Sequence, residues 1–252
     1  MRTTTAAVVI SLIAFLAGGT TLCVLVPESE DDAIRCSESF CEPSDVYIWS
    51  CPESNGYRYE ETALEMHISQ DEFEDSMHRH VFRQSTRFVV EPCNLVDPSD
   101  RYVRIVADHI LSATEGYSSW TRAQAALSFV QCAIGYCHDD DLYGREEFWA
   151  TPLETLYLHR GDCEDTAVLL CSILIAMGYD SVLLSEPGHL ATGVYLGGEL
   201  VYCETTGGSP GRMGAYDVGG AEIYVPSDCG LLGDITNVLA GIRSVFIRAA
   251  GA

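Results

Sequence analysis

The chain has 252 residues, of which 37 are acidic and only 14 basic, and its formal net charge at pH 7 is −23. Every basic residue other than histidine is arginine, because the sequence contains no lysine. This charge argues against nucleic acid or an anionic membrane surface as a partner. An excess of acidic residues suits a high-salt, halophilic setting, where ions screen the repulsion between carboxylates. The replacement of lysine by arginine is equally consistent with compositional drift in a GC-rich genome.

The N-terminus is predicted to be a membrane anchor. Residues 6–26 carry no charge, and a helix of this length reaches roughly 30 Å, enough to cross a bilayer. Arg2 precedes the segment and acidic residues follow it at 28–32, so the positive-inside rule leaves the rest of the chain outside the cytoplasm. We therefore expect residues 1–27 to be a transmembrane anchor, with a cleaved signal peptide of a secreted protein as the alternative.

Eleven cysteines in a chain that faces an oxidising compartment indicate disulfide bonds. Cys23 lies in the apolar N-terminal segment, Cys171 in an apolar helical stretch, and Cys163 in the candidate site considered below. No pair has the CxxC spacing of a typical structural zinc site, so we favour disulfides over zinc. The pairing stays open among eight cysteines, of which the first two and the fifth and sixth are close enough for local loops: Cys36, Cys41, Cys51, Cys93, Cys132, Cys137, Cys203 and Cys229.

Residues 28–98 are predicted to form an acidic linker followed by a small β-rich module. Hydrophobic and aromatic residues alternate with polar ones over short runs after the linker, which is typical of strands. Asn55-Gly56 is a hairpin turn signal between two of these runs. Residues 71–80 fit either a short helix or a charged loop, and the expected strands are 46–49, 57–59, 63–68 and 87–90.

Residues 99–252 are predicted to form an α+β domain. Apolar residues recur at helical spacing over 102–111 after Asp100 and over 120–134 after Ser118, and a third, mostly apolar helix follows Asp162 and ends at Gly178. Strands then follow, with Gly197-Gly198 as a tight turn, and helices followed by antiparallel strands favour the α+β class. These strands are expected at 181–185, 190–196, 199–205 and 222–225, and a polar amphipathic helix at 234–248.

Cys163 is the candidate nucleophile, because it lies in the first turn of the third helix. Asp162 is a good N-cap residue, and Asp165 can reach back to it as in a capping box. Unpaired N–H groups and the helix dipole favour a thiolate there, whereas neighbouring carboxylates raise the pKa of the thiol. A protonated His189 must then supply most of the thiolate stabilisation, and Glu204 follows in the order nucleophile, base, orienting acid.

Several motifs resemble the transglutaminase-like cysteine peptidase superfamily, and in particular its prokaryotic, membrane-associated members. The resemblance covers about residues 100–230, with a weaker likeness over 45–95. It implies a papain-like transglutaminase core, in which a nucleophile helix packs on an antiparallel sheet, with Cys163 as nucleophile, His189 as base and Glu204 as orienting acid. Family members usually have aspartate at the last position. The motifs are WATPLETL at 149–156, RGDCED at 160–165, GYD at 178–180, PGH at 187–189 and ETT at 204–206.

The function expected from the residues and the resemblance is thiol-dependent acyl transfer on peptide or isopeptide amides, by hydrolysis rather than cross-linking. Protein-glutamine transglutaminase activity and a non-catalytic binding module that retains the fold are the alternatives. The oxyanion would be held by the Cys163 N–H and one side chain, with Tyr143, Trp149 and Tyr157 as candidates. The substrate would be a protein or peptide, and no cofactor or metal is expected. The run from Asp139 to Asp141 fits a solvated acidic turn better than a calcium site. The sequence leaves the oligomeric state open.

Overall fold

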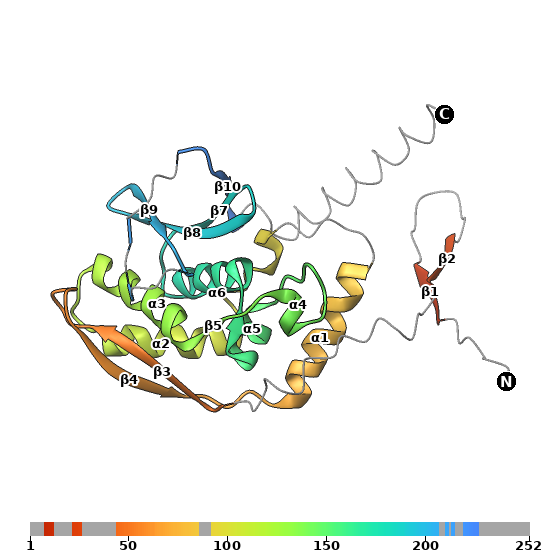
Figure 1. The fold of residues 1–252 in the computed structure, drawn as a ribbon, viewed down its shortest axis with the longest axis horizontal. Helices are drawn as coiled ribbons and strands as arrows, with labels where there is room; N and C mark the ends of the chain where they lie inside the picture. The colour runs from red at the N-terminus through yellow and green to blue at the C-terminus, as the bar shows by residue number, and fades with distance from the viewer. Residues whose placement is uncertain are drawn as a thin grey trace. The chain divides into compact units, whose positions relative to one another are not determined.

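The computed structural model describes residues 8–12, 22–26, 44–85, 92–206, 210–211, 213–214 and 219–226 (Figure 1). The chain divides into two compact units, Met1–Arg35 and Cys36–Ala252. In the first unit, β1 (Val8–Leu12) pairs antiparallel with β2 (Leu22–Val26). Both strands are rich in branched residues that favour extended backbone. No continuous helix forms over these ten residues, and no helix in the described ranges is both long and apolar enough to span a membrane, so anchoring stays a prediction.

The second unit contains a four-stranded antiparallel sheet in the order β10-β7-β8-β9. Gly197 and Gly198 have positive φ values of 63° and 88°, as the tight turn between β8 and β9 requires. The four expected strands are therefore confirmed, with ends shifted by one or two residues: β7 (Ser181–Glu186), β8 (His189–Leu196), β9 (Glu199–Cys203) and β10 (Glu222–Tyr224).

Helix α6 (Cys163–Ala176) packs on this sheet and contacts three other helices, α2, α3 and α5 (Figure 1). Its apolar side chains meet those of β7 and β8 in a core that includes Val168, Leu183 and Leu190. α2 (Arg101–Ala113) and α3 (Ser119–Ala133) contact α6, and each begins at an expected N-cap, where Asp100 and Ser118 accept hydrogen bonds from first-turn N–H groups. The packing of α6 on an antiparallel sheet confirms the α+β class.

In the described part of the β-rich N-terminal module, a single strand at 59–65 stands where strands were expected at 57–59 and 63–68. β3 (Val46–Pro52) and β4 (Tyr59–Glu65) form a hairpin that packs on α3, where Tyr47 and Trp49 contact Phe129. The segment that fitted a helix or a charged loop is part of the helix α1 (Gln70–Ser85), and η1 (Pro92–Leu95) follows. The strand expected at 87–90 and the helix expected at 234–248 lie outside the described residues.

Four short elements between α3 and α6 are not expected from the sequence. β5 (Gly135–Tyr136) and β6 (Arg160–Gly161) pair in parallel, and the chain between them forms α4 (Asp139–Leu142) and α5 (Pro152–Leu158). α5 begins with a capping box, in which Thr151 and Glu154 each bond the backbone N–H of the other. β6 runs directly into α6, so the β5–β6 pair fixes the chain at the start of this helix.

The disulfide expectation is wrong for Cys51, Cys132, Cys137 and Cys203, which are free thiols, as are Cys163 and Cys171. Cys51, Cys132 and Cys203 lie in strands or helices, whose backbones fix the directions of the side chains, and closeness in sequence alone does not bring two sulfurs into bonding geometry. Cys93 does form a disulfide, and its partner is a cysteine whose side chain is not described.

Candidate active site

Cys163 occupies the first position of α6, directly after the N-cap residue Asp162. Asp162 has the extended backbone of an N-cap, but its side chain accepts no hydrogen bond from the helix. The expected capping box is also absent, because Asp165 is buried and accepts instead from the N–H of Ala150 at 2.7 Å. The carboxylates around Cys163 therefore do not cap the helix.

His189 and Glu204 form the clearest interaction of the site. His189 is the first residue of β8, and Glu204 follows the last residue of the neighbouring strand β9. The antiparallel pairing of these strands places both side chains at the same end of the sheet. Nε2 of His189 lies 2.8 Å from Oε2 of Glu204, and the two side chains are only 26% and 14% exposed. The base and the orienting acid predicted from the sequence are thus hydrogen-bonded.

Glu204 is held by more groups than His189 alone. The Tyr202 hydroxyl donates to Oε2 at 3.0 Å, and the N–H and hydroxyl of Thr206 donate to Oε1 at 3.0 and 2.7 Å. Gln131 donates to the backbone carbonyl of Glu204 at 2.7 Å. Burial raises the pKa of Glu204, but the hydrogen bonds from His189 and Thr206 outweigh it and lower the pKa to about 2. The glutamate is therefore ionised and fixed in orientation.

The Glu204 carboxylate in turn favours the charged imidazole. The hydrogen bond to Glu204 raises the pKa of His189, against the opposing effect of burial, and the charges of Glu204, Glu186 and Glu164 act in the same direction. With Nε2 directed at Glu204, Nδ1 is the nitrogen left for proton exchange with a nucleophile, and in the described ranges it makes no hydrogen bond.

The first turn of α6 is tied to the segment that carries Glu204. The Thr166 and Thr205 hydroxyls lie 2.8 Å apart, and both side chains are buried. A hydrogen bond from the backbone N–H of Leu190, the residue after His189, lowers the pKa of the Cys163 thiol. The Cys163 thiol therefore lies near the backbone of Leu190, at the start of β8.

The Cys163 thiol is nevertheless not paired with His189 in the described structure. Sγ donates to Oε2 of Glu164 at 3.0 Å. Burial raises the pKa of the thiol to about 12, and the hydrogen bond to Glu164 and the charges of Glu164 and Asp162 contribute in the same direction. Burial, with the neighbouring acids acting in the same direction, therefore favours a neutral thiol in the resting protein.

An acid cluster of Asp139, Asp162 and Asp165 lies beneath Cys163. The three side chains are buried, each has a carboxylate oxygen without a hydrogen-bond partner, and one ligand atom from each lies within 4.8 Å of the others. Burial, and after it the charges of neighbouring acids, raise the pKa of Asp139 to about 7 and that of Asp162 to about 10, and raise that of Asp165 well above its usual value. Asp139 is therefore not part of a solvated turn.

Two chemical states satisfy such a cluster: the carboxyl groups are protonated, or they bind a cation. Three buried oxygen ligands fit a hard divalent ion such as Ca²⁺, which prefers carboxylates. A bound cation would supply positive charge next to Cys163 and would neutralise the carboxylates that raise the pKa of its thiol.

The three oxyanion-hole candidates lie in different surroundings. Tyr143 is buried with its ring 4.2 Å from that of Phe148. The indole N–H of Trp149 donates to Glu147 at 2.7 Å. Tyr157 is buried in α5, where it stacks on Phe73 of α1 with ring centroids 4.2 Å apart. Their proposed role as oxyanion donors stays a prediction.

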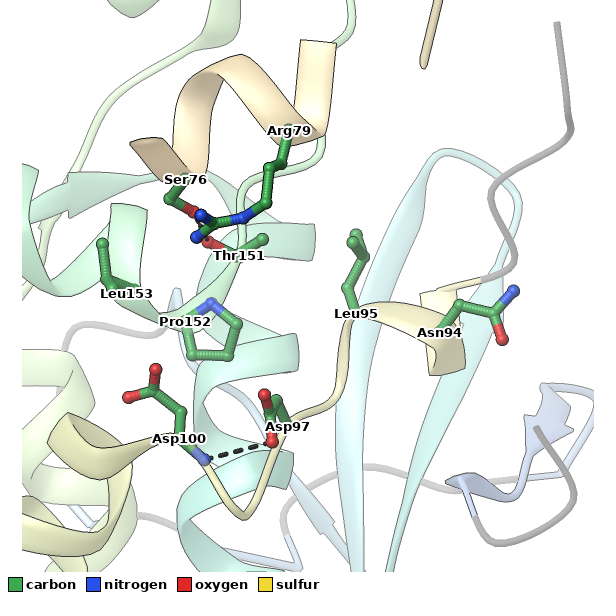
Figure 2. Close-up of a pocket in the computed structure, with 9 residues that line it drawn as sticks. All are labelled: Ser76, Arg79, Asn94, Leu95, Asp97, Asp100, Thr151, Pro152 and Leu153. Atoms are coloured by element: carbon green, nitrogen blue, oxygen red, sulfur yellow. Dashed lines mark hydrogen bonds between the residues drawn. The ribbon is translucent and has the colours of Figure 1, made fainter. Parts of the chain in front are cut away.

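A cavity of about 220 Å³ lies apart from the candidate catalytic residues, between α1, η1 and the starts of α2 and α5. Figure 2 shows Arg79 on one side of Pro152 and the carboxylates of Asp97 and Asp100 on the other. Asp97 accepts from the N–H of Asp100, and Asp100 caps α2, so both acids have structural roles. None of Cys163, His189 and Glu204 lines this cavity.

Sequence reasoning missed the residues that position the acid. Thr206 is signalled by the Glu-Thr-Thr run, because a hydroxyl two residues after an acid can close a local turn. Thr205 and Gln131 act across distant segments, and no local pattern marks them.

No protein-family model matches the sequence, and no curated protein sequence matches it. Among solved structures, the chain is similar to Legionella pneumophila LapG in an EGTA-treated form, with a TM-score of 0.36 and 15% identity over 51% of this chain and 78% of that one. A second LapG structure gives a TM-score of 0.36 and 14% identity over 54% and 84% of the two chains. A TGase gives a TM-score of 0.37 and 10% identity over 64% of this chain and 44% of its own. These likenesses are distant, and the chemistry of the site follows from its own residues.

Proposed function

We propose that the protein catalyses thiol-dependent acyl transfer on peptide or isopeptide amides, and that it is a cysteine peptidase or amidase. One observation carries the proposal: Nε2 of His189 bonds Glu204 at 2.8 Å, where β8 begins and β9 ends. A histidine oriented by a carboxylate, together with a cysteine at a helix N-terminus, is the set of groups that nucleophilic thiol catalysis uses, and we propose that Cys163 and His189 act together in this way.

In this mechanism Cys163 is the nucleophile and His189 the base. Nδ1 of His189 takes the thiol proton as Sγ attacks the carbonyl carbon and the S–C bond forms. The imidazolium then delivers that proton to the departing amine as the C–N bond breaks, which leaves a thioester. Water adds to the thioester with the reverse proton transfer, the S–C bond breaks, and the acid product leaves. Glu204 stays ionised and holds the imidazole in orientation.

The Cys163 thiol must leave Glu164 before it can react. At rest the S–H donates to the Glu164 carboxylate, so the first step is rotation of the side chain toward Nδ1 of His189. Catalytic hydrogen bonds in substrate-free sites often form only when substrate is bound.

The acceptor for the acyl group separates two activities. Water gives hydrolysis and a primary amine gives transamidation, through the same thioester. We favour hydrolysis, with protein-glutamine transglutaminase activity as the alternative and a non-catalytic binding module as a second one. The hydrogen-bonded His189–Glu204 pair supports catalysis over simple binding, because binding alone does not require an oriented base.

We also propose that the catalytic unit works outside the cytoplasm, attached to a membrane through residues 6–26. The uncharged segment between Arg2 and the acids at 28–32 supports this orientation. Membrane fractionation of cells followed by protease treatment of intact cells tests it: the full chain should be in the membrane fraction and be digested from outside. A full chain in the soluble cytosolic fraction would contradict the location.

Turnover of fluorescein-labelled casein at pH 8 by the full chain tests the activity. We expect activity in the wild type, none above background in Cys163→Ala, and a loss of at least about a thousandfold in His189→Ala. Cys132→Ala is the matched control, because it removes an exposed free thiol and should retain activity. Incorporation of dansylcadaverine into casein without cleavage would identify transamidation instead, and identical rates in wild type and Cys163→Ala would reject enzyme function.

A further inference from the structure

Tyr136 lies alongside the residues that lead into the nucleophile helix. β5 pairs in parallel with β6, and in this register Tyr136 is opposite Gly161, two residues before Cys163. The N–H of Cys137 donates to the Gly161 carbonyl at 3.0 Å, and the N–H of Gly135 donates to the His159 carbonyl at 2.8 Å. Backbone bonds on both sides of Tyr136 therefore fix its position next to Cys163.

The phenol of Tyr136 is subject to the charges of the candidate site. Burial and then the charges of Asp162, Cys163, Glu164 and Asp139 raise its pKa, so it stays protonated at neutral pH. The side chain is still 52% exposed, and in the described ranges its hydroxyl makes no hydrogen bond. The O–H donor of this residue, which pairs with the chain two residues before Cys163, is thus accessible to a substrate and not committed to another acceptor.

The ring of Tyr136 is also held in place. It packs edge-to-face on the ring of His138 with centroids 5.1 Å apart. Such contacts stabilise a particular ring orientation by about 0.5–1.5 kcal/mol. Preorganised donors stabilise a developing charge well because they need no reorientation during the reaction.

The backbone N–H of Cys163, at the start of α6, is a second hydrogen-bond donor that is free to bind an oxyanion. Asp162 caps none of the first-turn N–H groups with its side chain, and no hydrogen bond uses the N–H of Cys163 in the described ranges. Attack by Cys163 on a carbonyl produces an oxyanion close to that N–H, and such a site needs one more donor.

We propose that Tyr136 is a catalytic residue that supplies this donor, with its O–H bonding the oxygen that becomes negative when Cys163 attacks an amide carbonyl. This inference rests on the proposed function and assigns the role to a residue other than Tyr143, Trp149 and Tyr157. Tyr143 and Tyr157 are buried, and the indole of Trp149 already donates to Glu147, whereas Tyr136 is open to substrate.

Tyr136→Phe in the full chain tests the role, because it removes only the hydroxyl and keeps the ring on His138. We expect kcat on fluorescein-labelled casein to fall about 100-fold with KM changed by less than about twofold, since the lost bond forms mainly in the transition state. Alkylation of Cys163 by iodoacetamide should be unchanged, because that displacement produces no oxyanion. Tyr195→Phe, at a partly exposed tyrosine on β8, is the matched control and should behave like wild type.

The outcomes separate this role from the proposed function. A kcat for Tyr136→Phe within about twofold of an active wild type would overturn the role alone. An equal fall in casein turnover and in alkylation would also overturn it, because Tyr136 would then act on the thiol rather than on the oxyanion. Absence of Cys163-dependent turnover in the wild type would reject the proposed function and the role of Tyr136 with it. Melting temperatures of both variants should match the wild type, which excludes a folding defect.

Discussion

Replacing Glu204 by glutamine should cost both stability and activity. The pKa of Glu204 falls from 4.5 to about 2, because hydrogen bonds from His189 and Thr206 and the charge of His189 outweigh burial. At about 1.36 kcal/mol per pH unit, the difference of about 2.5 corresponds to roughly 3 kcal/mol. Because the folded-state pKa is lowered, this stability is present above about pH 4.5 and is lost as the pH falls through about 2. Near pH 6, Glu204→Gln should therefore lower the melting temperature by about 6–12 °C.

The same substitution should reduce turnover by about a thousandfold or more. A glutamine amide donates to Nε2 of His189, which moves the ring proton to Nδ1 and leaves no acceptor for the Cys163 thiol. Calorimetry from pH 2 to 7 and casein turnover measure the two effects. Tyr202→Phe is the control, since it removes one donor to the same oxygen, keeps the charge and should cost only about 1 kcal/mol. Near-normal turnover in Glu204→Gln, or equal stability at pH 6, would refute the reasoning.

Three further predictions concern the surroundings of Cys163. Glu164→Gln should lower the pKa of the Cys163 thiol from about 12 and raise its alkylation rate at pH 8 about tenfold. The control Glu199→Gln, in the distant β8–β9 hairpin, should leave the alkylation rate unchanged. Equal alkylation rates in the two variants would show that Glu164 does not raise the pKa of the thiol. Gly161→Ala should cost about 1–3 kcal/mol in urea unfolding, because its Cβ would lie 2.6 Å from that of Asp165; unchanged stability would contradict this packing. If the acid cluster binds Ca²⁺, an excess of about 100-fold over Kd should stabilise the protein by ~2.7 kcal/mol in a melting assay, and identical melting with Ca²⁺ and with chelator would favour protonated carboxyl groups.

The long elements of the second unit could be predicted because each has local signals. α2, α3 and α6 combine apolar residues with an N-cap residue, and the β8–β9 turn has two adjacent glycines. α5 had an equally clear signal in Thr151, Pro152 and Glu154, which form a capping box with proline at N1, and it could have been predicted. β5 and β6 could not, because two-residue strands have no period and depend on tertiary pairing.

One contact of the candidate site could be predicted from the sequence, but its resting geometry could not. His189 and Glu204, predicted as base and orienting acid, are hydrogen-bonded, whereas the catalytic roles of Cys163, His189 and Glu204 stay predictions. The Cys163–Glu164 hydrogen bond depends on rotamers of adjacent residues, which sequence patterns do not encode. The inward turn of Asp139 and the free state of four expected disulfide cysteines depend on how distant segments pack. The contacts of Thr205 and Gln131 likewise depend on how distant segments pack.

Acetylation of the full chain by p-nitrophenyl acetate tests the central claim, that Cys163 is the nucleophile and His189 its base, most directly. The sample is quenched with acid after one turnover, and the peptides are mapped by mass spectrometry. We predict one acetyl group on the peptide that contains Cys163, much slower labelling in His189→Ala, and none at that peptide in Cys163→Ala. Labelling of Cys163 no faster than of the exposed Cys132, or at an undiminished rate in His189→Ala, would contradict the account.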